Sequence, residues 1–329
     1  DLPIDMVVLH SDVPLLPMND DQSDAICVQS DPDREEGNAV LNVYTCQNRA
    51  TRLRIKFRTV EGQFGMVLCY VIPETSPKTS QRIQIPIKPL SLHSRIDYAD
   101  AVELQKGLPI NTLTITGQFA LTQVHGWVSS VVPGVPKRLS SETAELGYRS
   151  CFIASTLTCQ YSKDRATFRS ESVTAISIIK EVISREATNR QVKINIKLDV
   201  KPESVFHMLK VLRPKLDHHF AMNRKSRLLA GLKEIKSHEE DTSFLSQEYR
   251  DILQNGQLIK EAVANAPKHL EFLKGLVMDL YVDNHKLVHG AMPHSRKTED
   301  LGKALSSYDF DSLLHVFDAR RSSDQKMRM

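Results

Sequence analysis

The chain of 329 residues is 41% hydrophobic and 25% charged, and its formal net charge is +3 at pH 7. These values are typical of a globular protein with two or three domains, and they argue against a disordered chain. A membrane-spanning helix is not expected, because the longest strongly apolar run is residues 66–72. A disulfide framework is not expected either, because the five cysteines are scattered, odd in number and without a Cys-x-x-Cys spacing.

The first 136 residues predict short strands separated by turns. In residues 52–58, three apolar residues alternate with four basic ones, the pattern of a strand with one buried face. Strands are also predicted at residues 4–10, 24–29, 64–72 and 111–119. The two prolines of residues 85–92 place that segment at a sheet edge, since proline cannot donate to a ladder. We find no helical pattern here and expect a β-sandwich up to about residue 136.

Residues 133–141, which contain Pro, Gly and Ser, form the predicted linker to a second region. In that region the pattern changes from strand to helix and back. Strands are predicted at residues 150–161, 167–170 and 191–200, and helices at residues 171–183 and 203–212. This mixed order is typical of a small α+β domain.

From Pro214 onward the pattern is helical. Residues 226–235 and 247–264 predict two helices, and Pro267 is expected to close the second. A third helix follows from leucines spaced three and four residues apart up to Leu287, and a last helix is predicted within residues 301–317.

Two segments of the chain resemble a known family. Ile87-Lys-Pro-Leu-Ser-Leu-His93 and Asn111-Thr-Leu-Thr-Ile-Thr-Gly-Gln-Phe119 are similar to the C-terminal half of the seventh Bardet–Biedl syndrome protein family, whose members are BBSome subunits. The resemblance runs in colinear order from Leu2-Pro-Ile-Asp5 to Ser307-Tyr-Asp309 and so covers nearly the whole chain. One of the two sibling BBSome subunits with the same domain order remains the alternative. The family also has a β-propeller and a coiled coil, which these residues do not fit, so we expect a fragment.

The resemblance implies a multidomain α+β fold with three parts. Residues 1–137 are expected to form an immunoglobulin-like, γ-adaptin-ear-like β-sandwich. Residues 138–216 are expected to form a small α+β appendage platform. Residues 217–329 are expected to be all-α, with a helical hairpin and C-terminal helices.

No motif in the sequence predicts catalysis, a cofactor or a metal. His285 and His289 have the spacing of a helical metal site, but Lys286 stands where the zincin motif needs Glu. The sequence has no Walker loop, Gly-x-Gly-x-x-Gly or Gly-x-Ser-x-Gly, and its acidic residues are too evenly spread to nominate an acid–base pair. No aromatic residues interleave the basic ones in a nucleic-acid-binding pattern. We therefore expect a protein that is not an enzyme.

Charge is distributed unevenly along the chain. Residues 1–36 hold ten acidic side chains and one basic residue, Arg34, which favours contact with an oppositely charged partner. A basic row is formed by Arg52, Arg54, Lys56 and Arg58. Three interpretations of this row stay open: a solvated strand face, a device against unwanted edge pairing, or a patch for an acidic partner or a phosphoinositide head group.

An apolar seam is predicted on the third and last C-terminal helices. Its members are Leu270, Leu273, Val277, Leu280, Leu313 and Phe317. Two interpretations stay open, internal packing of a helical hairpin and docking against another subunit.

The resemblance implies a non-catalytic structural subunit of the BBSome, a coat-like adaptor that moves membrane proteins into and out of cilia. The second and ninth Bardet–Biedl subunits and chaperonin-like assembly factors are the expected partners, with ciliary membrane cargo and an anionic membrane surface as further candidates. The expected location is the cytoplasm, centriolar satellites and basal body, and the cilium, as a peripheral member at its membrane. The alternative is an appendage-type module that captures peptides or cargo, although the only tryptophan, Trp127, is expected in the sandwich and not in the platform.

Overall fold

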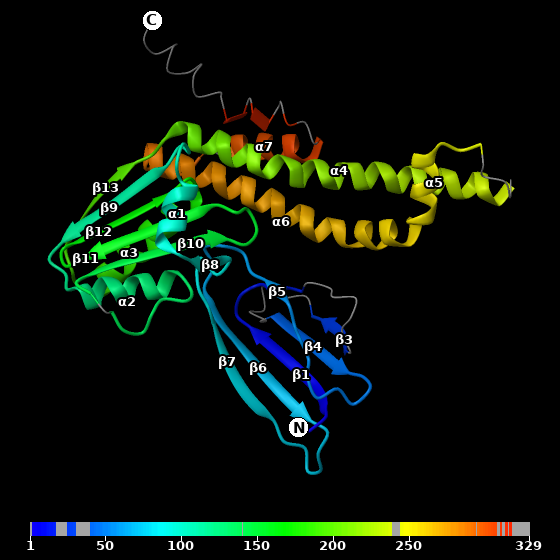
Figure 1. Ribbon diagram of the computed structural model, residues 1–329, viewed down its shortest axis with the longest axis horizontal. Helices are drawn as coiled ribbons and strands as arrows, with labels where there is room; N and C mark the ends of the chain where they lie inside the picture. The colour runs from blue at the N-terminus through cyan, green and yellow to red at the C-terminus, as the bar shows by residue number, and fades with distance from the viewer. Residues whose placement is uncertain are drawn as a thin grey trace, which may run out of the picture. The chain divides into compact units, whose positions relative to one another are not determined.

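The computed structural model divides into two compact units. It describes residues 2–17, 25–30, 40–139, 141–238, 244–293, 295–307, 310, 313–314 and 316–317. The first unit comprises Asp1–Lys106, Thr112–Ser170 and Ile178–Leu198, and the second comprises Gly107–Asn111, Glu171–Ser177 and Asp199–Met329. Two large β-sheets belong to the first unit and the long helices to the second (Figure 1). Among the residues described, no helix combines the length and the apolar character needed to span a membrane.

The first large sheet has the strand order β3-β4-β1-β6-β7. Its antiparallel strands are β1 (Ile4–Ser11), β3 (Ala25–Gln29), β4 (Val40–Cys46), β6 (Gly65–Pro73) and β7 (Gln81–Ile87). A small sheet pairs β2 (Leu16–Pro17) with β5 (Phe57–Arg58). Val7, Leu9 and Val67 point from one face of the large sheet into a core that also contains Leu15 and Phe57, because alternate residues of a strand share a face. The predicted β-sandwich is confirmed. Of the edge strand predicted at residues 85–92, only residues 85–87 belong to β7, which does lie at the sheet edge, and residues 89–92 form a turn.

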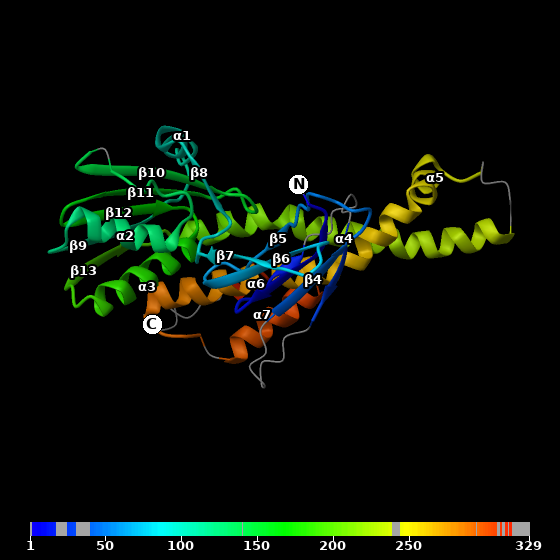
Figure 2. The same ribbon diagram turned by 90° about the horizontal axis from the view of Figure 1, so that it is seen from below.

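The second large sheet has the strand order β13-β9-β12-β11-β10-β8. Its strands are β8 (His93–Ile96), β9 (Asn111–Gly117), β10 (Thr143–Ser150), β11 (Thr156–Ser162), β12 (Arg165–Ser170) and β13 (Ile194–Asp199). The helices of this part are α1 (Tyr98–Leu104), α2 (Leu121–Val131) and α3 (Val173–Asn189) (Figure 2). The α1 helix lies against Gly147, whereas His125 of α2 bonds Tyr161 on the opposite face. The sheet is therefore covered on both faces, as in an α+β platform.

The predicted boundary at residue 137 lies inside this platform and is corrected by the strand pairing. Both β8 and β9 join the second sheet, so the sandwich ends at β7 and the platform begins near His93. The α2 helix was missed because its valines favour strands. Its buried residues nevertheless follow helical spacing, namely Val124, Trp127, Val128 and Val131.

Two long helices of the second unit pack against each other, α4 (Pro202–His238) and α6 (Gly256–His289). They are contacted by α5 (Gln247–Gln254), and α7 (Ser295–Ser307) packs on α6. Leu229 and Leu232 of α4 meet Ile252 and Ile259 in one hydrophobic cluster. Of the predicted last helix, residues 308–309, 311–312 and 315 lie outside the described part of the chain.

Both long helices continue through a proline at which a break was predicted. Pro214 lies within α4 and Pro267 within α6, so the predicted domain boundary at residue 216 falls inside a helix and moves to Pro202. A proline in a helix interior costs about 3 kcal/mol. Both prolines are exposed, whereas Leu212 and Phe272, two and five residues away on the same helices, are buried. Packing of the buried faces offsets the cost of each proline. The α6 helix ends at His289 and is capped by Gly290, whose φ of +68° suits glycine.

Candidate functional site

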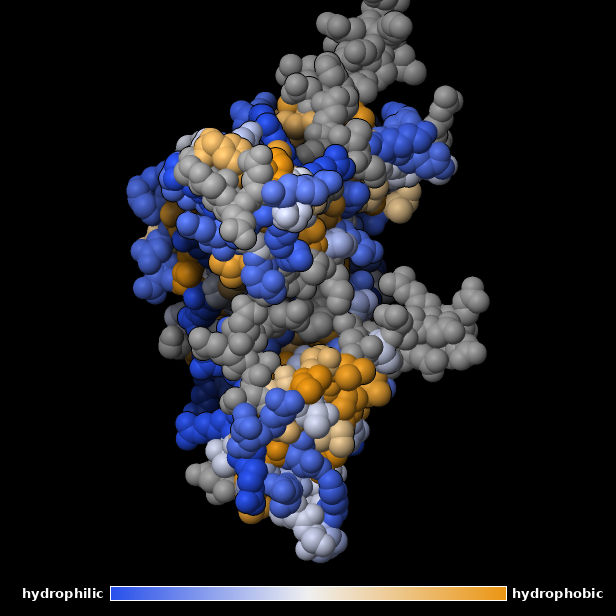
Figure 3. Space-filling view, turned by 90° about the vertical axis from the view of Figure 1, so that its right-hand side faces the viewer, coloured by the Kyte–Doolittle hydropathy of each residue, from blue (hydrophilic) through white to orange (hydrophobic). Residues whose placement is uncertain are grey.

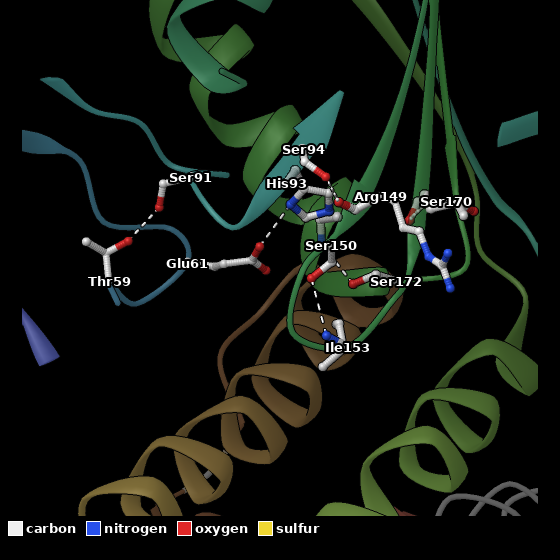
Figure 4. A network of polar contacts seen from close by, with 12 residues as sticks. Thr59, Glu61, Ser91, His93, Ser94, Arg149, Ser150, Ile153, Ser170 and Ser172 are labelled. Carbon is white, nitrogen blue, oxygen red and sulfur yellow. Dashed lines mark hydrogen bonds and ion pairs between the residues drawn. The ribbon is translucent and has the colours of Figure 1, made fainter. Parts of the chain in front are cut away.

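The loop between β5 and β6 joins the sandwich to the platform through a buried glutamate–histidine pair. The Oε1 atom of Glu61 lies 2.9 Å from Nδ1 of His93, the first residue of β8, and the two side chains are 5% and 0% exposed (Figure 4). The direction of approach does not meet hydrogen-bond geometry, and Nε2 of His93 has no hydrogen-bond partner among the described residues. Because both side chains are buried, the pair can position the loop but cannot contact a substrate in solution.

Two hydrogen bonds flank this pair. The hydroxyl oxygens of Thr59 and Ser91 are 2.5 Å apart, and the backbone N–H of Gly62 donates to the carbonyl oxygen of Pro89 at 2.8 Å. Gly62 has a φ of +86°, a backbone conformation that residues with a side chain rarely adopt. The loop is thus held by backbone and side-chain contacts together.

Two arginine–aromatic contacts complete the junction. The guanidinium carbon of Arg58 lies 4.3 Å from the ring centroid of Phe152, and that of Arg185 lies 4.3 Å from the ring centroid of Phe64. Burial lowers the pKa of Arg58. Each contact brings one residue of the sandwich onto one of the platform, so the Glu61–His93 pair, hydrogen bonds and stacking hold the two large sheets of the first unit together.

The predicted basic row is shorter in the structure than in the sequence. Arg52, Arg54 and Lys56 are exposed, but Arg58 is only partly exposed and lies over an aromatic ring. Of the predicted strand at residues 52–58, only β5 pairs in a ladder, although the preceding apolar residues still pack on the sandwich core. Three cations therefore remain on one side of this segment, and Arg58 belongs to the junction.

The predicted apolar seam is mostly buried. Five members are at most 6% exposed, namely Leu273, Val277, Leu280, Leu313 and Phe317. Leu270 is partly exposed. Phe317 stacks edge-on against Tyr281 of α6, with 5.3 Å between the ring centroids. The internal-packing interpretation accounts for this burial, and docking of another subunit on the seam stays a prediction.

The paired histidines of α6 lie side by side. The rings of His285 and His289 lie 4.7 Å apart, and Nδ1 of His285 donates to the carbonyl oxygen of Ala291 at 2.9 Å. Over the described part of the chain, no group of His, Cys, Asp and Glu side chains is arranged to hold a metal ion.

The only tryptophan lies in the platform, not in the sandwich where we expected it. Trp127 is on α2, is completely buried and packs edge-on against Phe119, with 5.4 Å between the ring centroids. It is therefore a core residue of the platform and presents no surface to a peptide.

Comparisons with known proteins follow the same three parts. Residues 1–85 match the family model of the BBS7 GAE domain, residues 93–199 that of the BBS7 platform domain, and residues 202–317 that of the BBS7 hairpin. The chain is 39% identical to the BBSome complex member BBS7 of Mus musculus over 318 residues, which are 96% of this chain and 44% of the mouse protein. It is 31% identical to the BBSome complex member bbs-7 of Caenorhabditis elegans over 263 residues, which are 79% of this chain and 36% of that protein.

A β-sandwich of the GAE type, an α+β platform and a helical hairpin in this order define a class of proteins whose matched relatives are named BBSome complex members. Within that class, the chain belongs to the BBS7 family. It spans less than half the length of the curated relatives it matches.

Proposed function

We propose that this chain is a non-catalytic structural part of a BBSome subunit and supplies surfaces on which the complex assembles. The observation that carries the proposal is the colinear match of sandwich, platform and hairpin to BBSome complex members. The complex itself is proposed to act as a coat-like adaptor that carries membrane proteins to and from the cilium. The proposed partners are the second and ninth Bardet–Biedl subunits and chaperonin-like assembly factors, and the proposed location is the cytoplasm, basal body and cilium.

The junction between sandwich and platform supports an assembly role. Glu61, Arg58 and Phe64 from the sandwich side each contact a platform residue, so the two sheets of the first unit form one block. A partner bound to the sandwich is then held at a fixed position relative to the platform. Such preorganisation reduces the entropy lost when a large complex forms.

The exposed basic residues Arg52, Arg54 and Lys56 are proposed to meet an acidic partner or anionic lipid head groups. Capture of peptides by an aromatic anchor on the platform finds no support, because the tryptophan of that domain, Trp127, is buried. We therefore favour assembly over peptide capture in a platform groove.

The test is the mass of the purified chain by light scattering, alone and after mixing with the C-terminal part of the second Bardet–Biedl subunit. We expect a new 1:1 species, and no such species with an isolated γ-adaptin ear, which has the same fold class but belongs to another complex. A chain that stays monomeric with the second subunit contradicts the proposal.

A further inference from the structure

The two large sheets of the first unit present different surfaces. Hydrophobic surface gathers on the sandwich in Figure 3, and Ile26 and Val28 of β3 are 55% and 64% exposed. The platform sheet instead has a polar face on its neighbouring strands β12, β9 and β13. Because alternate residues of a strand share a face, the polar residues of these strands lie opposite the buried Phe168, Leu113 and Ile115. Together they are called the open face, namely Thr112, Thr114, Thr116, Arg165, Thr167, Arg169, Asn195 and Lys197.

The α1 helix covers the neighbouring strands β10 and β11 but leaves the open face exposed. Arg169 is paired with Thr158, and Thr158 with Gly147, against which α1 packs, so α1 and the open face lie on the same side of the sheet. Beneath α1, Thr156 and Thr158 are only 2% exposed. By contrast, Thr167 and the threonines of β9 are partly exposed, and none of the described elements buries them. Since a helix is about 10 Å across, α1 forms a wall beside the open face.

Three exposed cations lie on the open face, Arg165 and Arg169 of β12 and Lys197 of β13. Among the residues that the structure describes, no carboxylate lies within ion-pair distance of any of them. Exposed cations of one sign sum their fields, so the open face attracts negative charge.

The acidic residues on the same side of the sheet already have partners. Gln160 of β11 donates a hydrogen bond to Glu145 of β10 at 2.9 Å. At the end of β13, the carboxylate of Asp199 lies 3.1 Å from the ammonium group of Lys201. These carboxylates therefore leave the positive charge of the open face available to a partner.

The spacing of the cations fits an extended chain. Arg165 and Arg169 are four residues apart on one strand, which separates them by about 13 Å. A second extended chain has the same rise, so two acidic residues four positions apart can reach both arginines. Lys197 lies two strands away, about 10 Å across the sheet, and the threonine hydroxyls of β9 between them can donate and accept hydrogen bonds. The wall formed by α1 keeps a planar bilayer away from these hydroxyls, whereas an extended chain fits beside it.

We propose that the open face binds an extended acidic segment of another subunit, in which two aspartates or glutamates lie four positions apart. Their carboxylates would form charge-assisted contacts with Arg165 and Arg169, and the threonines would bond polar side chains of the segment. Lys197 adds to the positive field that selects an acidic partner. This contact needs no aromatic anchor. The inference rests on the proposed assembly role, since it assigns the chemistry of one assembly surface.

Two synthetic peptides of equal composition test the spacing. Each consists of serine and threonine with two glutamates, which are four positions apart in the probe and adjacent in the control, and each carries a label for fluorescence anisotropy. The ionic strength is kept at about 0.01 M, where charges are screened only beyond about 30 Å. We expect the probe to bind at least about threefold more tightly than the control, because only the probe reaches both arginines.

Exposed residues of the chain supply matched variants. Arg169→Glu should weaken binding of the probe at least about fivefold, whereas Arg82→Glu, the same charge change at an exposed position of β7, should alter it by less than about twofold. Thr114→Val removes a hydroxyl, favours the strand and should weaken binding about twofold. Circular dichroism reports whether each variant is folded, and Arg165→Glu takes the place of Arg169→Glu if the latter unfolds.

Three results would overturn the inference. The first is equal binding of the two peptides, or an equal loss of probe binding in Arg169→Glu and Arg82→Glu. The second is sedimentation of the chain with phosphatidylserine-containing vesicles that Arg169→Glu abolishes, while the probe does not bind, because the occupant is then a membrane. The third is a dimer of the unchanged chain that Arg169→Glu dissociates, since the occupant is then a second copy.

Mixing with the second Bardet–Biedl subunit tests the assembly role separately. If a 1:1 species forms but the probe does not bind, the assembly role stands and the open face is not one of its surfaces. If the probe binds through Arg169 but no 1:1 species forms, the open face is a site for acidic segments and the assembly role with that subunit fails.

Discussion

Removing one member of the buried Glu61–His93 pair should destabilise the first unit. His93→Leu leaves the Glu61 carboxylate, whose side chain is 5% exposed, without its partner at 2.9 Å. Breaking a buried ion pair on one side costs about 3–5 kcal/mol, because the remaining charge is neither solvated nor paired. Replacing both residues, in Glu61→Leu/His93→Leu, removes that charge and should recover most of the lost free energy of unfolding.

Urea unfolding followed by tryptophan fluorescence measures this effect. Trp127 is the only tryptophan and is buried in the platform, so its emission reports unfolding of the domain that contains His93. With a denaturant slope of about 1–3 kcal/mol per molar urea, a loss of about 3–5 kcal/mol lowers the midpoint by at least about 1 M. The control is the ion pair between Glu186, partly exposed on α3, and Arg190, which directly follows α3; their charged groups are 3.6 Å apart. Glu186→Gln should change the free energy of unfolding by less than about 1 kcal/mol.

The test is a comparison of the urea midpoints of the single and the double variant. Equal midpoints for His93→Leu and Glu61→Leu/His93→Leu would show that the Glu61 charge is not held by His93, and the account of the junction would be wrong.

Three further outcomes are expected. Leu273→Ala on α6 should lower the free energy of unfolding of the helical unit by about 2–5 kcal/mol, measured by circular dichroism in urea, whereas Leu258→Ala, 64% exposed on the same helix, should change it by less than about 0.5 kcal/mol. Gly147→Ala should destabilise the platform by about 1–3 kcal/mol, because its methyl group would lie 2.7 Å from a backbone oxygen next to α1. As a control, the methyl group of Gly275→Ala on α6 meets no atom within 4 Å and should stabilise that helix by up to about 1 kcal/mol. Burial, followed by two neighbouring histidines, lowers the pKa of His219, so the folded state favours the neutral ring and stability should fall as the pH drops through about 6.5. The melting temperature should therefore decrease between about pH 7.5 and about pH 5.5, and His219→Gln should reduce that decrease.

The sequence predicted elements well where local periodicity determines them. The alternation in residues 52–58 is reproduced in the burial of Leu53, Ile55 and Phe57, even though most of that segment lacks ladder pairing. Pro86 correctly predicted the edge position of β7, whereas Pro89 lies in a turn and not in the predicted strand. In each case the deciding property, alternation or a missing N–H, belongs to a few consecutive residues.

Prediction failed where packing overrides local preference. Val124, Val128 and Val131 favour strands individually, but together with Trp127 they form the buried stripe of α2. Pro214 and Pro267 suggested helix ends, but burial on the opposite side keeps both helices continuous. These errors moved two domain boundaries without changing the fold class.

The Glu61–His93 junction could not have been found from the sequence. Its two residues are 32 positions apart, lie in different domains and belong to no periodic pattern. Sequence reasoning instead assigned Arg58 to a solvent-exposed row, because strand alternation gives the side of a residue but not what covers that side.

For β3 too, the sequence predicts a strand but not its surroundings. Its apolar residues identify a strand, but they do not say whether that strand lies in the centre of a sheet, where an uncharged sequence is normal, or at an edge, where it favours association. The order β3-β4-β1-β6-β7 supplies the missing fact, because it puts β3 at the edge and leaves the N–H groups of Cys27 and Gln29 directed outward.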